Sequence, residues 1–242
     1  MRTILFDFGG TLDCPRHWLD RFLSHYHDVG IVVTRPALDL AFEAATRNAY
    51  RSAAQLRDFR LAELLHYLVS SQLAFLRDSR PALQWSVDLA DPAMAVDLTN
   101  RISHSFLEES RRGLARSREV LAKLSRTFAI GVVSNFYGNL DRILSEAGFD
   151  GIVSAIADSG QLGIYKPDPR IYEAALARLS AEAATTMMVG DSLDKDCAPA
   201  KALGMGTVWL RHREATEPPD SALADFTISD LAELQDLICR IT

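Results

Sequence analysis

The chain has 242 residues, of which 48% are hydrophobic and 24% are charged, and its formal net charge is -6. This composition excludes a mostly disordered or collagen-like chain, and the length suits one large domain or a core domain with an insertion. The acidic balance gives a phosphate backbone no electrostatic support, so we expect no nucleic-acid partner.

The cysteines and the N-terminal segment indicate a cellular compartment. Cys14, Cys197 and Cys239 are an odd number and lack metal-binding spacing, which argues against a disulfide framework and favours a reducing, cytoplasmic location. The apolar run before Asp7 is too short for a signal peptide, and no run is long enough to cross a membrane. We therefore expect no membrane partner.

Short apolar runs that end in small or polar residues predict the buried strands of a parallel sheet. The first run stops at Gly9 and Gly10, as a strand that enters a tight turn would. The runs cover residues 3–8, 128–134, 151–156, 187–190, 206–210 and 226–228. Helical patterns lie between them over 140–147, 170–179 and 197–203, and this alternation favours helices on both faces of the sheet.

The interval from about residue 16 to residue 125 has a different pattern, since it lacks strand signals and is rich in Ala, Leu, Arg and Glu. Three to five helices are predicted here, punctuated by Pro36, Pro81 and Pro92. Leucines at helical spacing predict a buried or interface face rather than a cofactor site, and they are Leu61, Leu64, Leu65 and Leu68.

We therefore predict an α/β fold with a three-layer α/β/α Rossmann-like core and an α-helical cap inserted after the first strand. The core would comprise residues 1–15 and 118–242, and the cap residues 16–117. Near the C-terminus, Glu217–Asp220 predicts an exposed loop.

Polar residues follow several of the predicted strands. Asp7 follows the first, Ser134 and Asn135 end the second, and Asp191 follows the strand at 187–190, while Lys166 lies in a loop between these segments. Ligands of open parallel sheets bind at the carboxyl ends of the strands, where the strand order reverses. Two carboxylates, a hydroxyl and an amine at one edge indicate a phosphate and metal site.

Four short motifs carry these residues in a fixed order, FDFGGTLD (6–13), VVSN (132–135), YKPDP (165–169) and VGDSLDKDCAPAKALGM (189–205). In this order they resemble the motifs of the haloacid dehalogenase superfamily, whose members are mostly magnesium-dependent phosphatases with this core and cap. The resemblance implies a Mg²⁺-dependent phosphatase or phosphoryl transferase that acts on a small phosphorylated metabolite.

The resemblance also implies roles for individual residues. Asp7 would be the nucleophile that forms an aspartyl phosphate. Ser134 and the backbone N–H of Asn135 would bind phosphate oxygens, with Gly10 as a further substrate-binding position. Lys166 would neutralise charge between the nucleophile and the transferring phosphoryl group.

The same resemblance implies a magnesium site. Its ligands would be the carboxylates of Asp7 and Asp191 and the backbone carbonyl of Gly9, because Mg²⁺ prefers oxygen ligands. Asp196 would have a supporting role, by orienting the metal's waters or Lys166.

Gly9 departs from the family pattern, because phosphatases of this family normally carry there a second aspartate that acts as general acid and base. Glycine keeps the carbonyl for the metal and lacks the side chain for proton transfer. We therefore expect slow or atypical turnover, with Asp13 or His17 as candidate substitutes.

Three alternatives follow from the departure at Gly9. A non-catalytic protein of this fold could bind a phosphorylated ligand, and a dehalogenase could hydrolyse a carbon–halogen bond, although Gly190–Asp191 keeps the metal-type form. The phosphonatase branch is disfavoured, because it needs a cap lysine and the first lysine here is Lys123, beyond the predicted cap. A monomer and a homodimer both fit the sequence.

Overall fold

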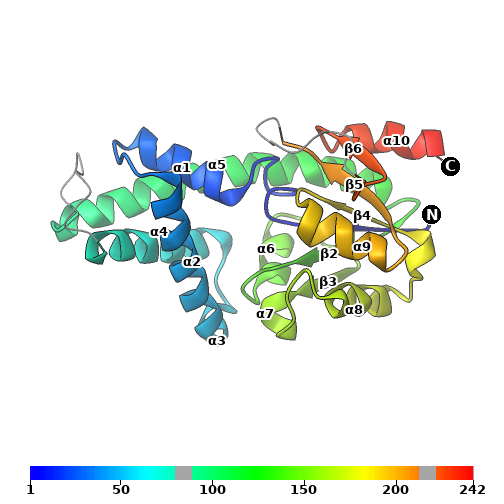
Figure 1. The fold of residues 1–242 in the computed structure, drawn as a ribbon, viewed down its shortest axis with the longest axis horizontal. Coiled ribbons are helices and arrows are strands. Elements are labelled where there is room, and N and C mark those ends of the chain that lie inside the picture. The colour runs from blue at the N-terminus through cyan, green and yellow to red at the C-terminus, as the bar shows by residue number, and fades with distance from the viewer. Residues whose placement is uncertain (80–88, 213–221, 242) are drawn as a thin grey trace. The chain divides into compact units, whose positions relative to one another are not determined.

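The computed structural model describes residues 1–79, 89–212 and 222–241. The chain forms two compact units, one of Met1–Arg16 with Arg111–Thr242 and one of His17–Ser110 (Figure 1). The first contains every strand that the described residues form, and the second is helical. Pro81 and the predicted loop at Glu217–Asp220 lie outside the described residues.

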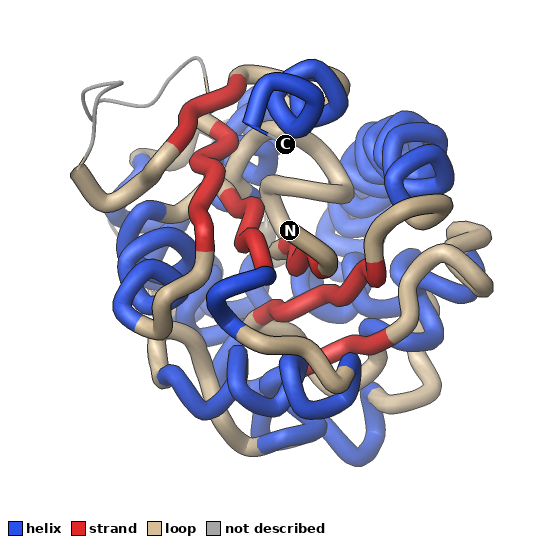
Figure 2. Tube along the Cα trace, turned by 90° about the vertical axis from the view of Figure 1, so that its right-hand side faces the viewer, coloured by secondary structure: helices blue, strands red, loops and turns tan. Residues whose placement is uncertain are grey.

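Six parallel strands form the sheet of the first unit, in the order β3-β2-β1-β4-β5-β6. Figure 2 shows them side by side with helices on both sides, as predicted for an α/β fold. The strands are β1 (Thr3–Phe6), β2 (Ala129–Ser134), β3 (Ala155–Asp158), β4 (Thr186–Gly190), β5 (Gly206–Leu210) and β6 (Phe226–Ile228).

One strand lies later in the chain than predicted. The apolar run at 151–156 begins in a turn, because the N–H groups of Ile152 and Val153 both donate to the carbonyl of Phe149. β3 starts only at Ala155, after Ser154 donates its N–H to Ile130 of the neighbouring strand.

Strand β1 lies at the centre of the sheet and is buried throughout. Phe6 pairs with Val132 of β2 on one side and with Val189 of β4 on the other. The strand order reverses at β1, so the segments that follow β1, β2 and β4 emerge together at one edge.

The helices of the first unit cover this sheet, and α8 packs on it through Ile171, Tyr172 and Ala175, against Leu5 and Val133. Burying both faces of the strands removes their continuous apolar runs from water. The helices are α6 (Leu140–Glu146), α7 (Ser159–Leu162), α8 (Pro169–Leu179), α9 (Ala198–Ala202) and α10 (Glu233–Ile241), with short turns η1 (Ala183–Thr185) and η2 (Leu193–Cys197).

The second unit has five helices among its described residues, within the predicted range of three to five. They are α1 (Trp18–Asp28), α2 (Arg35–Arg51), α3 (Ala53–Leu56), α4 (Leu61–Asp78) and α5 (Pro92–Leu124), and α5 continues past Ser110 into the first unit. The four predicted leucines of α4 are buried. Among the described residues, no helix combines the length and apolar character needed to cross a bilayer.

A buried arginine links α1 to α5 within the second unit. The Arg21 guanidinium donates to Glu109 Oε2 at 3.0 Å, to Ser110 Oγ at 2.6 Å and to the Phe106 carbonyl at 3.2 Å. It also lies 3.7 Å from the centre of the Phe106 ring, and His25 Nε2 lies 3.0 Å from Glu109 Oε2. Arg21 therefore has a polar or aromatic partner on several sides.

Within the first unit, the segment after β1 lies tightly against α5. A Cβ atom at Gly113 would lie 1.8 Å from the carbonyl oxygen of Asp13, so only glycine allows this approach. One turn further along α5, Ser117 Oγ donates to the Leu12 carbonyl at 2.7 Å.

Candidate active site

Asp7 begins the loop after β1, and its backbone N–H still donates to the Val189 carbonyl at 2.9 Å. This bond extends the strand pairing by one residue and fixes where the carboxylate lies. Its Oδ1 accepts hydrogen bonds from Lys166 Nζ at 2.5 Å and Ser134 Oγ at 3.1 Å. Thr11 Oγ1 donates to Oδ2 at 3.3 Å, so both oxygens of a nearly buried carboxylate are oriented.

Lys166 bridges two carboxylates, because its Nζ also donates to Asp196 Oδ1 at 2.6 Å. Its side chain is only 4% exposed, so the ammonium depends on these partners for solvation. The residues that follow it start α8, where Asp168 caps the helix by accepting from the Arg170 N–H at 3.0 Å.

Asn135 holds the backbone of this lysine with both ends of its amide. The Lys166 N–H donates to Asn135 Oδ1 at 2.7 Å, and Asn135 Nδ2 donates to the Lys166 carbonyl at 3.1 Å. Asn135, in the motif VVSN, therefore positions Lys166, in the motif YKPDP. Both polar atoms of the Asn135 side chain thus bond to Lys166. The role predicted for Asn135, binding a phosphate oxygen, concerned its backbone N–H.

Two further carboxylates follow β4. Asp196 Oδ2 accepts from the Ser192 N–H at 3.0 Å, which closes the π-helical turn η2. Ligand atoms of Asp7, Asp191 and Asp196 all lie within 4.8 Å of one another, and this cluster could hold a metal ion. Three carboxylates against the one Lys166 ammonium leave the cluster with an excess of negative charge.

Burial and repulsion both act on the pKa values of this cluster. Burial raises the pKa of Asp7, the nearby Lys166 opposes that shift, and Asp191 adds to it. The pKa of Asp196 is raised in the same way, by burial first and by the charges of Asp7 and Asp191. Burial would lower the pKa of Lys166, but Asp196 and Asp7 outweigh it, so the lysine remains an ammonium.

The turn after Asp7 uses glycine where the chain passes the acidic cluster. Gly10 has a φ of +88°, and a Cβ there would lie 2.4 Å from Asp191 Oδ2. Its N–H donates to Asp13 Oδ1 at 2.8 Å. The residue before it, Gly9, offers only its backbone to the site.

The two candidate substitutes for an acid/base at Gly9 both have structural partners. Asp13 is fully buried and bonds to the Gly10 N–H. His17 is the N-cap of α1, where its Nδ1 accepts from the Leu19 N–H at 3.2 Å. Both side chains therefore have a local role in the backbone of their own segment.

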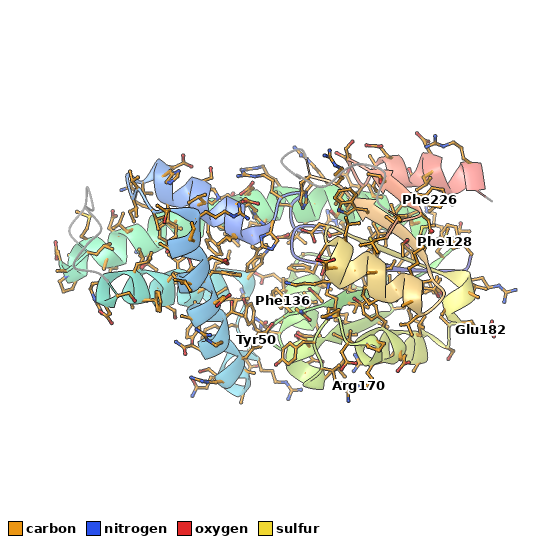
Figure 3. All side chains as sticks on the ribbon, viewed as in Figure 1. Tyr50, Phe128, Phe136, Arg170, Glu182 and Phe226 are labelled. Carbon is orange, nitrogen blue, oxygen red and sulfur yellow. The ribbon has the colours of Figure 1, made fainter. Side chains whose placement is uncertain are left out.

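Buried aromatic rings follow Asp7 and Ser134 in the chain. Phe8 and Phe136, the latter labelled in Figure 3, meet edge to face with ring centroids 5.1 Å apart. The Phe136 N–H donates to Ser159 Oγ at 2.9 Å. These contacts anchor both loops in apolar surroundings, where electrostatic interactions at Asp7 are stronger than in water.

Three residues of the site were not predicted from the sequence. Thr11 orients Asp7, while Trp209 and His212 contact Asp191: Trp209 Nε1 donates to the Asp191 carbonyl at 2.9 Å, and His212 Nε2 lies 3.0 Å from Asp191 Oδ2. The sequence offers no motif for the last two, because their position beside Asp191 depends on the pairing of β5 with β4, in which Trp209 lies opposite Gly190.

A family model described as a haloacid dehalogenase-like hydrolase matches residues 1–204. The chain belongs to this family. Haloacid dehalogenase-like hydrolase domain-containing protein 3 of Mus musculus is 30% identical over 233 residues, which cover 93% of this chain and 86% of that protein. The phosphoserine phosphatase of Thermus thermophilus is 29% identical over 150 residues, which cover 60% of each chain. This hydrolase thus has relatives that are named phosphatases.

Solved structures of haloacid dehalogenase-like proteins share the fold. A crystal structure of a dehalogenase with an intermediate complex has a TM-score of 0.63 and 20% sequence identity, and the match covers 98% of this chain and 96% of that one. At this identity the likeness concerns the fold of the family and not its chemistry.

Proposed function

We propose that this hydrolase is a Mg²⁺-dependent phosphatase or phosphoryl transferase that acts on a small phosphorylated metabolite through an aspartyl phosphate on Asp7. The observation that carries the proposal is the setting of the Asp7 carboxylate, which Lys166 and Ser134 contact within a cluster of two further carboxylates. The phosphatase names of several relatives support the same reaction class.

In the first step an Asp7 oxygen attacks the phosphorus atom, and the bond from phosphorus to the leaving oxygen breaks. In the second step water or another acceptor takes the phosphoryl group and releases the carboxylate. The Lys166 ammonium and the Ser134 hydroxyl both contact Asp7 Oδ1, so a phosphoryl group on Asp7 would be within their reach and they would stabilise the charge that develops on its oxygens.

The donor set fits a divalent cation. When ionised, the three carboxylates and the one ammonium leave two negative charges uncompensated, which equals the charge of one Mg²⁺. The carboxylates of Asp7 and Asp191 and the carbonyl of Gly9 would hold it, and Asp196 would stay with Lys166. A bound Mg²⁺ supplies Lewis-acid polarisation of phosphoryl oxygens.

Proton transfer is the step for which this chain lacks the expected side chain. Gly9 has no side chain, and Asp13 and His17 are engaged in their own segments. General acid/base catalysis contributes about 100- to 10,000-fold, so we expect turnover to be slower by a factor of this order. Acyl and aryl phosphates need little leaving-group protonation, and the aspartyl phosphate should accumulate because its hydrolysis lacks a base.

The test measures phosphate release from acetyl phosphate and p-nitrophenyl phosphate, with Mg²⁺ or with EDTA. The native protein should be slow and Mg²⁺-dependent, Asp7→Asn should be inactive, and Gly9→Asp should be faster. Acid-quenched native protein should carry about 80 Da of added mass, one phosphoryl group, on Asp7. Folded native and Gly9→Asp proteins that both release no phosphate would exclude the proposal.

A non-catalytic binding protein is the second candidate, and the glycine at position 9 favours it. Such a protein would gain thermal stability from a phosphorylated ligand without releasing phosphate. Halide release from a 2-haloacid in the absence of metal would instead indicate the dehalogenase alternative.

A further inference from the structure

The end of β5 contacts Asp191 at two places. Trp209 is buried in β5, and its indole N–H donates to the Asp191 backbone carbonyl at 2.9 Å. Two residues after the strand, His212 Nε2 lies 3.0 Å from Asp191 Oδ2, and its side chain is 14% exposed. The neighbouring strand therefore holds both the backbone and the carboxylate of this residue.

The direction of the histidine hydrogen bond follows from its partner. An ionised carboxylate only accepts hydrogen bonds, so His212 Nε2 donates. His212 Nδ1 is buried and has no hydrogen-bond partner among the described residues. Leaving an unprotonated ring nitrogen without a partner costs less free energy than leaving a buried N–H without one. This favours the tautomer with the proton on Nε2.

His212 acts on the acidic cluster through Asp191 and not as a member of it. The atoms that lie within 4.8 Å of one another belong to Asp7, Asp191 and Asp196, and no nitrogen of His212 is among them. The same Asp191 Oδ2 lies 2.4 Å from the place that a Cβ at Gly10 would take, so glycine leaves room for this oxygen. Glycine at position 10 thus gives the Asp191 carboxylate space, and His212 supplies its hydrogen bond.

We propose that His212 is a positioning residue for Asp191 and that it raises the affinity of the acidic cluster for a divalent cation. The inference rests on the proposed function, because it takes Asp191 as a metal ligand. A carboxylate held in the orientation that the metal needs loses less freedom on binding, and hydrogen-bond partners of metal ligands typically change metal affinity by about 10- to 100-fold.

The test is a binding measurement on the full chain without substrate. Mn²⁺ is titrated while the electron paramagnetic resonance signal of the free ion is recorded, and Mg²⁺ affinity is measured by competition. His212→Ala should weaken both affinities by about 10- to 100-fold. His212→Gln, whose side-chain amide nitrogen can donate to the same oxygen, should recover most of the affinity. His104→Ala, a change at an exposed histidine of the second unit, is the matched control and should bind like the native protein.

The other outcomes show whether this inference fails alone or together with the proposed function. If His212→Ala binds as tightly as native protein or more tightly, while Asp191→Asn does not bind, the positioning role is wrong and the metal site stands. If native protein binds neither ion, both are wrong. Melting temperatures in EDTA identify variants that are unfolded. If His212→Ala is unfolded, the metal affinities of His212→Gln and His212→Leu are compared instead.

Discussion

Each unit of this molecule buries a charge network, and the two networks differ in their balance. In the helical unit, the Arg21 guanidinium donates to the acidic Glu109, to the Phe106 carbonyl and to the Ser110 hydroxyl. In the sheet unit, Lys166 serves both Asp7 and Asp196, and Asp191 lies beside them with no further lysine or arginine among its described hydrogen-bond partners.

We interpret this difference as one between a structural network and the site of the proposed function. Satisfied charges hold two helices together and have no reason to bind anything further. Unbalanced carboxylates in a buried setting repel one another, and they persist in a folded protein when a ligand supplies the missing charge. We therefore take the imbalance, more than the burial, as the support for a ligand site at the edge of the sheet.

The largest effect is expected for Lys166→Met, which removes the one cation from the unbalanced network. Breaking a buried ion pair costs about 3 to 5 kcal/mol, and the free energy of unfolding should fall by this amount. Phosphate release should fall to the level of Asp7→Asn. Urea unfolding and phosphate assays measure both, with Lys201→Met at an exposed lysine as control. Native stability in Lys166→Met would mean that the carboxylates take up protons at little cost.

Arg21→Met should be less costly, although Arg21 is as buried as Lys166. Glu109 is 19% exposed and lies beside His25, so it keeps some solvation when the guanidinium is lost. We expect the free energy of unfolding to fall by about 2 to 3 kcal/mol, with phosphate release per folded molecule unchanged. Arg77→Met, at an exposed ion pair, is the control. A loss of activity without a loss of stability would contradict the structural role of this network.

Asp191→Asn tests whether a cation completes the network of the sheet unit. Native protein should gain about 2.7 kcal/mol of unfolding free energy when Mg²⁺ is at 100 times its dissociation constant, and the variant should gain none. In EDTA the variant should be at least as stable as native, because the Asp191 charge raises the pKa of both Asp7 and Asp196. Thermal unfolding with and without Mg²⁺ decides this, and equal Mg²⁺ stabilisation in both proteins would place the metal elsewhere.

The smallest effect is expected at the exposed pair of Lys201 and Asp225. Burial alone would raise the pKa of Asp225, but Lys201 and Thr207 outweigh burial and hold this pKa below its ordinary value. The stabilisation is therefore fully present above the ordinary aspartate pKa of about 4 and is lost as the pH falls through the lower value of the folded state. Lys201→Ala should cost at most about 1 kcal/mol at pH 7 and less near pH 3. Urea unfolding at the two pH values measures the difference, and a cost that grows at low pH would contradict this assignment.

Residues at strand ends could be predicted from the sequence because parallel strands carry them to a common edge. Asp7, Ser134 and Lys166 each belong to a recognisable motif, and the structure brings Ser134 and Lys166 into contact with Asp7. His212 has no motif. Its contact with Asp191 depends on the register of β5 against β4, which the apolar pattern of either strand leaves open.

The sequence predicts the helical character of the second unit, which the structure shows. The sequence predicts a helical segment over 16–117, and the second division of the chain falls between Ser110 and Arg111. That division lies inside α5, a helix of 33 residues from Pro92 to Leu124. An unbroken helix has no capping or breaking residue at the point where it passes from one unit to the other, so the sequence carries no mark there.

The close contact between Gly113 and the Asp13 carbonyl has a consequence for the modularity of the chain. The polypeptide leaves the sheet unit just after Asp13 and returns to it just before Gly113, so exit and return lie side by side. A loop of about 2 to 6 residues is the common length for joining neighbouring elements and would close this gap. Such a loop would remove the helical unit from the connection between β1 and β2 and would leave the order of the strands in the sheet unchanged.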